Sequence, residues 1–275
     1  MVDIKGIIVA ICTPMHDDES LNLDELRNQI ERQIESGIDG IFTTGTNGEG
    51  YILNGDEKRQ VLATAIDQVK GRVPVYAGTG CITTKETIEQ SLTAKALGAD
   101  AISIITPSFA TASQEELYQH FKAVAEAVDL PILLYNIPAR TGNTLEPETV
   151  RRLSKIKNIV GVKDSSGKWE SLKAYLEITK ERPDFIVLSG NDSLILDGLI
   201  EGGKGGIAGC ANVYPALLSS IYDLYIEGKI DEARVAQNSI ASFRAVFKFG
   251  NPNTIVKKAV ELLGYPVGPC KAPFN

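Results

Sequence analysis

Lys163 is the residue whose type and position point most clearly to chemistry. It directly follows an apolar run, residues 159–162, at the place where a buried strand would end. Burial there disfavours the charged ammonium form, and a neutral amine can attack a carbonyl carbon and form a Schiff base. The alternative is a lysine that extends its amine to solvent or pairs with Asp164. Position alone does not decide between them.

Tyr135 and residues 45–48 offer further groups that such chemistry needs. Tyr135 ends another apolar run, and its phenol could carry protons to and from a Schiff-base intermediate. The alternative is a core tyrosine whose hydroxyl bonds to the backbone. Residues 45–48, Gly-Thr-Asn-Gly, supply backbone N–H groups and a hydroxyl suited to a carboxylate, or form a plain tight turn. For Glu49, which follows them, a structural role is favoured.

Short apolar runs and amphipathic stretches alternate from one end of the chain to the other. The runs show little polar alternation, which is typical of parallel strands buried on both faces. They are residues 7–11, 40–43, 73–77, 101–105, 132–135, 159–162, 185–188 and 206–208. Eight strand-plus-helix units predict an α/β fold, a (β/α)8 TIM barrel, whose usual size is about 250 residues. A doubly wound sheet is the rival, but no composition break interrupts the units.

The segment after the eighth unit is longer than the single helix that a barrel needs. Helix-like patterns cover residues 215–227, 230–248 and 254–263. We therefore expect residues 1–214 to form the barrel core. Residues 215–275 would supply the last barrel helix and a small C-terminal helical extension, in one continuous domain. Barrel enzymes carry their catalytic groups at the C-terminal strand ends, which is where Lys163 and Tyr135 fall. The glycine-rich residues 202–206 precede the eighth strand, at the opposite end.

Composition excludes several classes of protein. The chain carries 28 Lys+Arg against 35 Asp+Glu, a formal net charge of -7, which argues against binding to nucleic acid or anionic membranes. The apolar stretch at residues 6–12 is far shorter than the roughly 20 residues that span a bilayer. Four scattered cysteines fit a reducing cytoplasm, and two distant histidines remove most His-based metal sites. We expect a cytoplasmic protein without a metal.

Three segments resemble the signature blocks of the dihydrodipicolinate synthase / N-acetylneuraminate lyase family: residues 45–49, 135–142 and 162–167. The resemblance runs in order over nearly the whole chain. It implies a class I aldolase that acts on pyruvate and a small aldehyde without a cofactor, as a homo-oligomer (tetramer or dimer). It also implies that Lys163 forms an imine with pyruvate and that Tyr135 and Thr46 relay protons. The implied substrate-binding residues are Asn47, Gly48, Arg140, Gly190 and Ile207.

The chain departs from the family pattern at positions that bear on the substrate. The synthases usually carry two tyrosines where this chain has Ser108 and Phe109, and the second tyrosine completes a proton relay in the neighbouring subunit. Asn47 stands where a Thr or Ser is usual. Of four positions that match the lysine-inhibition site of many relatives (Gly55, Ile82, Glu86 and Ser108), Glu86 alone keeps its character. The sequence therefore predicts no inhibition by lysine.

Three functions remain open from the sequence. Arg140 favours the family's synthase reaction, the condensation of pyruvate with aspartate semialdehyde in lysine biosynthesis, because a guanidinium can bind a carboxylate with paired hydrogen bonds. Phe109 favours an aldolase of 2-keto-3-deoxy sugar acids or an enzyme like N-acetylneuraminate lyase. A barrel that binds a keto acid without turnover is an alternative of a different class. The synthase reaction is our first expectation.

Overall fold

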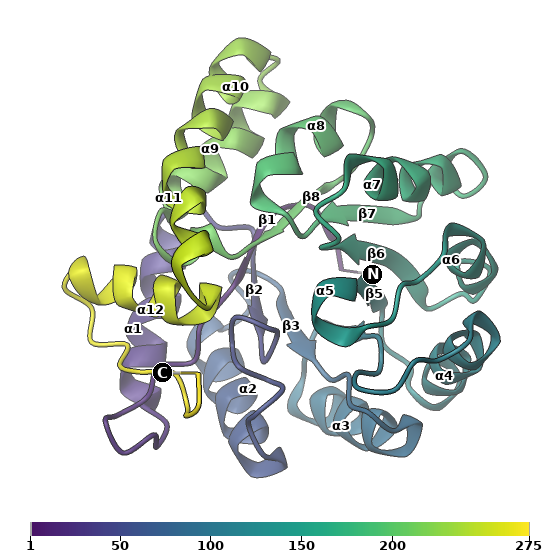
Figure 1. Ribbon diagram of the computed structural model, residues 1–275, viewed down its shortest axis with the longest axis horizontal. Coiled ribbons are helices and arrows are strands. Elements are labelled where there is room, and N and C mark those ends of the chain that lie inside the picture. Colours follow the sequence, from purple (N-terminus) through teal and green to yellow (C-terminus); the bar gives the residue numbers. More distant parts are fainter. Residues whose placement is uncertain (1, 275) are drawn as a thin grey trace.

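Within residues 2–274, which this computed structural model describes, eight parallel strands close into a barrel in chain order (Figure 1). They are β1 (Gly6–Ala10), β2 (Gly40–Thr43), β3 (Val75–Gly78), β4 (Ala101–Ile105), β5 (Ile132–Asn136), β6 (Ile159–Asp164), β7 (Ile186–Ser189) and β8 (Gly205–Ala208). Every predicted run is a strand, with ends that differ by no more than two residues. The predicted TIM barrel is confirmed, and the rival doubly wound sheet is wrong.

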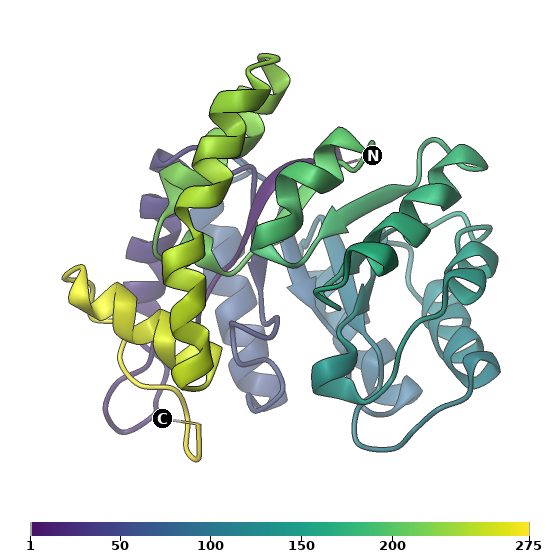
Figure 2. The same ribbon diagram turned by 45° about the horizontal axis from the view of Figure 1, so that its top comes forward.

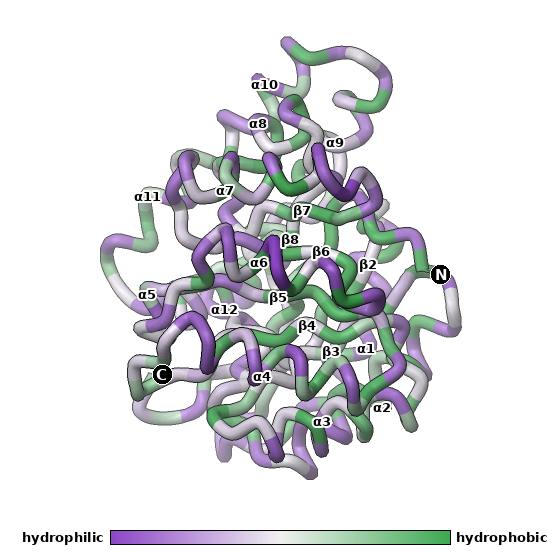
Figure 3. The backbone as a smooth tube through the Cα atoms, turned by 90° about the vertical axis from the view of Figure 1, so that its right-hand side faces the viewer, coloured by the Kyte–Doolittle hydropathy of each residue, from purple (hydrophilic) through white to green (hydrophobic). Residues whose placement is uncertain are grey.

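Apolar side chains pack on both faces of the strands. The barrel interior holds Ile8, Ala10, Phe42, Tyr76, Ala101, Leu133, Val160, Leu188 and Ile207. A second, larger apolar cluster lies between the strands and the surrounding helices. In Figure 3 the hydrophobic colouring gathers along the central strands. Since both faces are buried, the strands have no polar face, which explains the continuous apolar runs.

Helices follow the strands, and all but the short helix after β5, which lies at the C-terminal end of the barrel, form the outer ring (Figure 1). They are α1 (Leu23–Glu35), α2 (Gly55–Val69), α3 (Thr84–Leu97), α4 (Gln114–Ala127), α5 (Pro138–Thr141), α6 (Pro147–Leu153), α7 (Trp169–Leu176) and α8 (Ile195–Ile200). Helix α2 begins with a capping box: the Asn54 side chain accepts the Glu57 N–H, and the Glu57 carboxylate accepts the Asn54 N–H. None of the helices within residues 2–274 is long and apolar enough to cross a membrane.

The C-terminal region forms four α-helices: α9 (Pro215–Ile226), α10 (Ile230–Ser239), α11 (Ala241–Ala245) and α12 (Pro252–Leu262). The prediction of one helix over residues 230–248 is wrong, because the helix is interrupted at Ile240. The Ser239 hydroxyl donates to the Val235 carbonyl at 2.8 Å, a contact that bends helices. Gln237 is held in place by its 2.7 Å bond to the Asp192 carbonyl. Figure 2 shows α11 and α12 on the side of the barrel nearest α1.

Candidate active site

Lys163 lies at the C-terminal end of β6, directly opposite Tyr135 of β5 in the strand register. It is 3% exposed, so an amine that extends to solvent is excluded. Its Nζ lies 3.9 Å from the centroid of the Tyr135 ring and 5.1 Å from that of Phe42. The neighbouring Asp164 carboxylate is engaged elsewhere, since it accepts the Asn136 amide at 2.8 Å. Lys163 is therefore a buried amine among aromatic rings, which decides between the two alternatives that its position left open.

Gly190, which follows β7, leaves the space that the Lys163 side chain occupies. A Cβ at position 190 would lie 2.8 Å from Lys163 Cε and 2.0 Å from Ser165 Oγ, closer than any side chain tolerates. Ile207, in the neighbouring strand β8, is buried and also lines the cavity around Lys163. Sequence reasoning singled out Gly190 and Ile207 but missed Ser165. A hydroxyl two residues after the lysine was the available signal.

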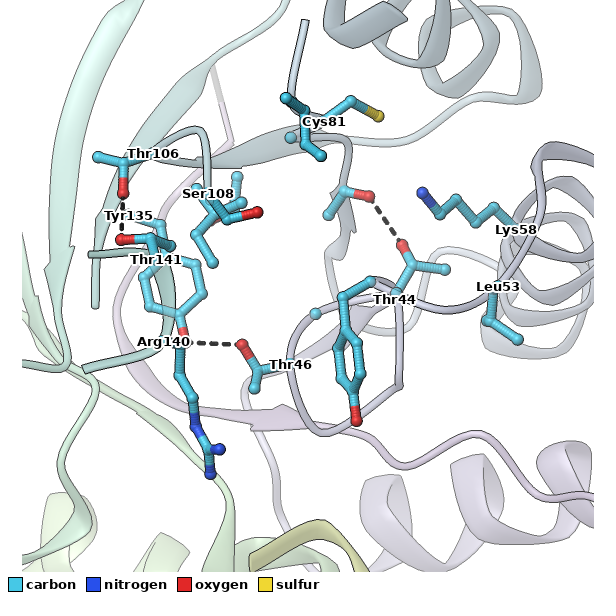
Figure 4. A pocket seen from close by; sticks show the side chains of 18 of the residues that line it. Thr44, Thr46, Leu53, Lys58, Cys81, Thr106, Ser108, Tyr135, Arg140 and Thr141 are labelled. Atoms are coloured by element: carbon cyan, nitrogen blue, oxygen red, sulfur yellow. Dashed lines mark hydrogen bonds between the residues drawn. The ribbon is translucent and has the colours of Figure 1, made fainter. Parts of the chain in front are cut away.

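Tyr135 is buried, and its hydroxyl meets a side chain rather than the backbone: Thr46 Oγ1 lies 3.1 Å from it (Figure 4). Burial by itself would raise the pKa of Tyr135. The charge on Lys163 and hydrogen bonds with Thr46, Ser165 and Lys163 oppose it, and the net pKa lies below the ordinary value for tyrosine. The interpretation as a core tyrosine bonded to backbone is wrong. A phenol with a lowered pKa beside an amine is suited to exchanging protons.

The loop after β2 places Thr46 and Asn47; we call residues 44–50 the β2 loop. Its backbone is tightly folded: Thr44 and Glu49 have φ of 53° and 56°, rare for side-chain-bearing residues. A Cβ at Gly50 would lie 1.9 Å from the Thr44 carbonyl oxygen, so only glycine fits there. The Thr13 hydroxyl donates to the Gly48 carbonyl at 2.7 Å. The segment is therefore a tightly folded turn, and its role in binding a carboxylate stays a prediction.

A cavity of about 260 Å³ at the C-terminal end of the barrel gathers most of the expected site. Its walls include Thr46, Asn47, Tyr135, Arg140, Lys163, Gly190 and Ile207. Gly48 is buried within the β2 loop and is not among the residues that line the cavity. Arg140 lies in the short helix α5 and is exposed at the mouth.

The C-terminal helices supply part of the same wall, which sequence reasoning missed. Arg244 of α11 and Asn253 of α12 both line the cavity. Arg244 Nη1 lies 3.1 Å from the buried carboxylate of Asp192. The same carboxylate accepts the N–H groups of Gly209 and Cys210, which follow β8, at 3.0 and 3.2 Å. These contacts join α11 to the strand ends.

A second cavity, of about 530 Å³, lies beside the first and shares Thr46, Tyr135, Arg140 and Asn253 with it. Figure 4 shows it, with Thr46 and Tyr135 pointing toward one another. Ser108 lines this cavity, whereas Phe109 is 99% exposed with φ of 80°. Within this chain, position 109 therefore adds no hydroxyl to the Tyr135–Thr46 pair.

Two other features of the sequence were tested as sites. In residues 2–274, no group of three or more His, Cys, Asp or Glu side chains is placed to hold a metal ion. The glycine-rich residues 202–206 lead into the start of β8, at the end of the barrel opposite Lys163. The position expected for this segment is confirmed.

The comparisons with known proteins agree with the geometry. Residues 3–275 match the Dihydrodipicolinate synthetase family. The chain belongs to this family. Relatives include two 4-hydroxy-tetrahydrodipicolinate synthases. That of Methanopyrus kandleri is 41% identical and covers 99% of this chain and 91% of its own length. That of Syntrophus aciditrophicus is 44% identical and covers 94% of this chain and 88% of its own length.

A solved structure of the family extends the similarity to three dimensions. The dihydrodipicolinate synthase of Acinetobacter baumannii, described as chloride-inhibited and complexed with pyruvate, is 37% identical to this chain. It superimposes with a TM-score of 0.95 over 99% of this chain and 93% of its own. The family fold is therefore preserved over essentially the whole described chain.

Proposed function

We propose that this enzyme condenses pyruvate with aspartate semialdehyde, the 4-hydroxy-tetrahydrodipicolinate synthase reaction, through a Schiff base on Lys163. The observation that carries the proposal is the buried Lys163 amine beside the Tyr135–Thr46 pair, inside one cavity. The synthase names of relatives at about 40% identity support it. The similar Acinetobacter synthase, whose structure is a complex with pyruvate, supports it as well.

Each chemical step is assigned to a group in the cavity. The Lys163 amine, once it has given up a proton, attacks the ketone carbon of pyruvate, and loss of water leaves an imine. Tyr135, with Thr46 at 3.1 Å, gives a proton to the departing oxygen and takes protons back. Loss of a methyl proton gives an enamine, whose carbon attacks the aldehyde. The amino group of aspartate semialdehyde then attacks the imine carbon and releases Lys163.

Different parts of the cavity wall are assigned to the two substrates. The β2 loop is assigned the pyruvate carboxylate, through the Thr46 hydroxyl and the Asn47 amide, which line the cavity, whereas Gly48 does not reach it. Arg140, at the mouth, is assigned the carboxylate of the aldehyde, which a guanidinium binds with paired hydrogen bonds. Gly190 leaves room for the imine-bearing side chain.

We also infer that the enzyme works in the cytoplasm and assembles with copies of itself, as a tetramer or a dimer. Phe109 supports self-assembly, since its φ of 80° is a strained conformation and its ring is 99% exposed within one subunit, so contacts that hold it would come from a second copy. Ile82, 61% exposed, borders the same cavity as Ser108. An interface here would cover these apolar side chains.

Phe109 is also the observation that favours the second candidate, a sugar-acid aldolase, because it has no hydroxyl to lend to a neighbouring site. Borohydride trapping with pyruvate tests the shared chemistry: a covalent mass should appear on the peptide that holds Lys163 and vanish in Lys163→Ala. Labelling at Lys204 instead would refute the assignment, and no labelling would favour a non-catalytic barrel. Rates with aspartate semialdehyde and with 2-keto-3-deoxy sugar acids then separate the two enzymes.

A further inference from the structure

A buried ion pair joins the β2 loop to the C-terminal extension. Lys257 of α12 and Glu49 of the β2 loop have 2% and 0% of their side chains exposed, and Nζ lies 2.6 Å from Oε1. Lys257 also donates to the Pro269 carbonyl at 2.7 Å. The second oxygen of Glu49 accepts the Lys271 N–H at 2.9 Å. Both charges are therefore held from several directions.

Stability alone does not account for this pair. Burying two charges costs several kcal/mol per ion, and apolar residues of similar size are often as stable or more so. A buried ion pair with further hydrogen bonds instead fixes the positions of its two residues, because the partners must meet in one geometry. Glu49 needs such fixing, since its φ of 56° is a strained conformation that persists only where the surroundings hold it.

A second contact from the same helix reaches the residue that matters for proton transfer. Asn253 lies one turn before Lys257, is buried, and donates its amide to the Thr46 carbonyl at 2.8 Å. Helix α12 thus contacts the β2 loop at two residues that are three positions apart, Thr46 through a hydrogen bond and Glu49 through the ion pair. Between them lie Asn47 and Gly48. The side chain of Thr46 in turn meets the Tyr135 hydroxyl at 3.1 Å.

We propose that the Glu49–Lys257 pair and the Asn253 amide form a positioning device, through which helix α12 holds Thr46 in register with Tyr135. The proposal rests on the relay role that the proposed function gives to Thr46 and Tyr135. It assigns the C-terminal extension a part in catalysis although neither Glu49 nor Lys257 lines the substrate cavity, and Asn253 acts through the Thr46 carbonyl.

The test compares Asn253→Ala, Lys257→Met and the charge-free double variant Glu49→Gln/Lys257→Met with the wild type. Thr46→Val is the reference for a lost relay. Asn158→Ala is the matched control, because its amide donates to the Val128 carbonyl at 2.8 Å just before the start of β6, at the end of the barrel opposite Lys163. The measurements are kcat, KM for pyruvate, the pH profile of kcat, and Tm.

We expect Asn253→Ala and Lys257→Met to lower kcat by about 10-fold or more, since a shift near 1 Å can cost about 100-fold. Pyruvate should still be trapped on Lys163. The Thr46 hydrogen bond helps to lower the pKa of Tyr135, so its displacement should move the Tyr135-dependent limb to higher pH, as in Thr46→Val. The variants leave Lys163 on β6 and Arg140 on α5, the cations near Tyr135, unchanged. A shift of the pH profile would therefore not come from a lost positive charge at these residues. Asn158→Ala should lower Tm and leave kcat, KM for pyruvate and the pH profile unchanged.

The double variant separates positioning from stability. Lys257→Met alone leaves the Glu49 carboxylate buried without its cation. The double variant removes this charge as well, so Tm should recover while kcat stays low. Recovery of kcat together with Tm would overturn the proposal, as would wild-type kcat and pH profile in folded Asn253→Ala. If Thr46→Val itself has wild-type kcat, the relay and the positioning proposal both fail. If Thr46→Val is slow but the α12 variants are not, positioning alone fails.

Discussion

Tyr135→Phe removes one oxygen from the site and leaves the rest of the side chain in place. The ring should keep its packing at 3.9 Å from Lys163 Nζ, because a phenylalanine ring has the same shape. Thr46 loses the partner that lies 3.1 Å from its hydroxyl. Imine formation and enamine formation both need a proton carrier at this point, so the substitution tests the relay directly.

Two magnitudes separate catalysis from folding. Loss of a positioned general acid–base group typically costs about 10²–10⁴-fold in rate, or about 2.7–5.4 kcal/mol in the activation barrier. Loss of a neutral hydrogen bond costs only about 0.5–1.5 kcal/mol of stability. We therefore expect kcat to fall at least about 100-fold while the protein stays folded at room temperature.

The assay measures kcat at saturating pyruvate and aspartate semialdehyde, with unfolding in urea measured in parallel. Tyr175→Phe is the matched control, because Tyr175 is another buried tyrosine and its hydroxyl donates to the Leu145 carbonyl outside the barrel. That variant should lose similar stability and keep its kcat. A Tyr135→Phe enzyme within a few-fold of the wild-type rate would refute the relay and make Tyr135 a packing residue.

Three further predictions follow from other parts of the structure. Arg140→Ala should lower kcat/KM for aspartate semialdehyde about 10–150-fold, the loss of about 1.5–3 kcal/mol from a charge-assisted contact, while pyruvate trapping on Lys163 persists; unchanged kinetics would contradict the assignment. Millimolar lysine should leave the rate unchanged, since Glu86 is the one retained polar contact and cannot by itself offset desolvation of an amino acid; a clear dose response would contradict this. Burial lowers the pKa of His120 from 6.5 to about 4. The unfolded chain therefore binds a proton that the folded chain does not, and stability should fall by up to about 3 kcal/mol as pH drops from 6.5 toward 4, measured by urea unfolding. His120→Gln should flatten that dependence, and an unaltered slope would contradict it.

The parts of the site that could be predicted from sequence are those set by local pattern. Lys163 and Tyr135 each end an apolar run, and in a closed parallel barrel the C-terminal strand ends meet in one place. That rule alone brings the two residues together, and the register confirms it by pairing Tyr135 with Lys163. Gly190 and Ile207 came from family resemblance, and the structure supplies the steric reason for the first.

The parts that could not be predicted depend on contacts between distant segments. Asn253 is 207 residues from Thr46, and no periodicity in α12 reports that its amide faces the β2 loop. The same holds for Arg244 and its ion pair with Asp192. The interruption at Ile240 also has a tertiary cause, because buried Gln237 is tied to the chain after β7. Helix propensity alone favours one continuous helix there.

From the sequence alone, the missing hydroxyl at position 109 counts against the synthase reaction. The structure weakens that argument. Thr46 and Tyr135 line both cavities, so a proton that they exchange has a second way out of the substrate cavity. That second space, about 530 Å³, has the side chains of Thr44, Ser103 and Thr106 in its walls. It has these hydroxyl groups in its walls and is roomy enough for water, which exchanges protons with a hydroxyl pair as a tyrosine does. Arg140 stands between the two spaces and lines both, so the carboxylate of the aldehyde would be bound where the proton path and the substrate path meet.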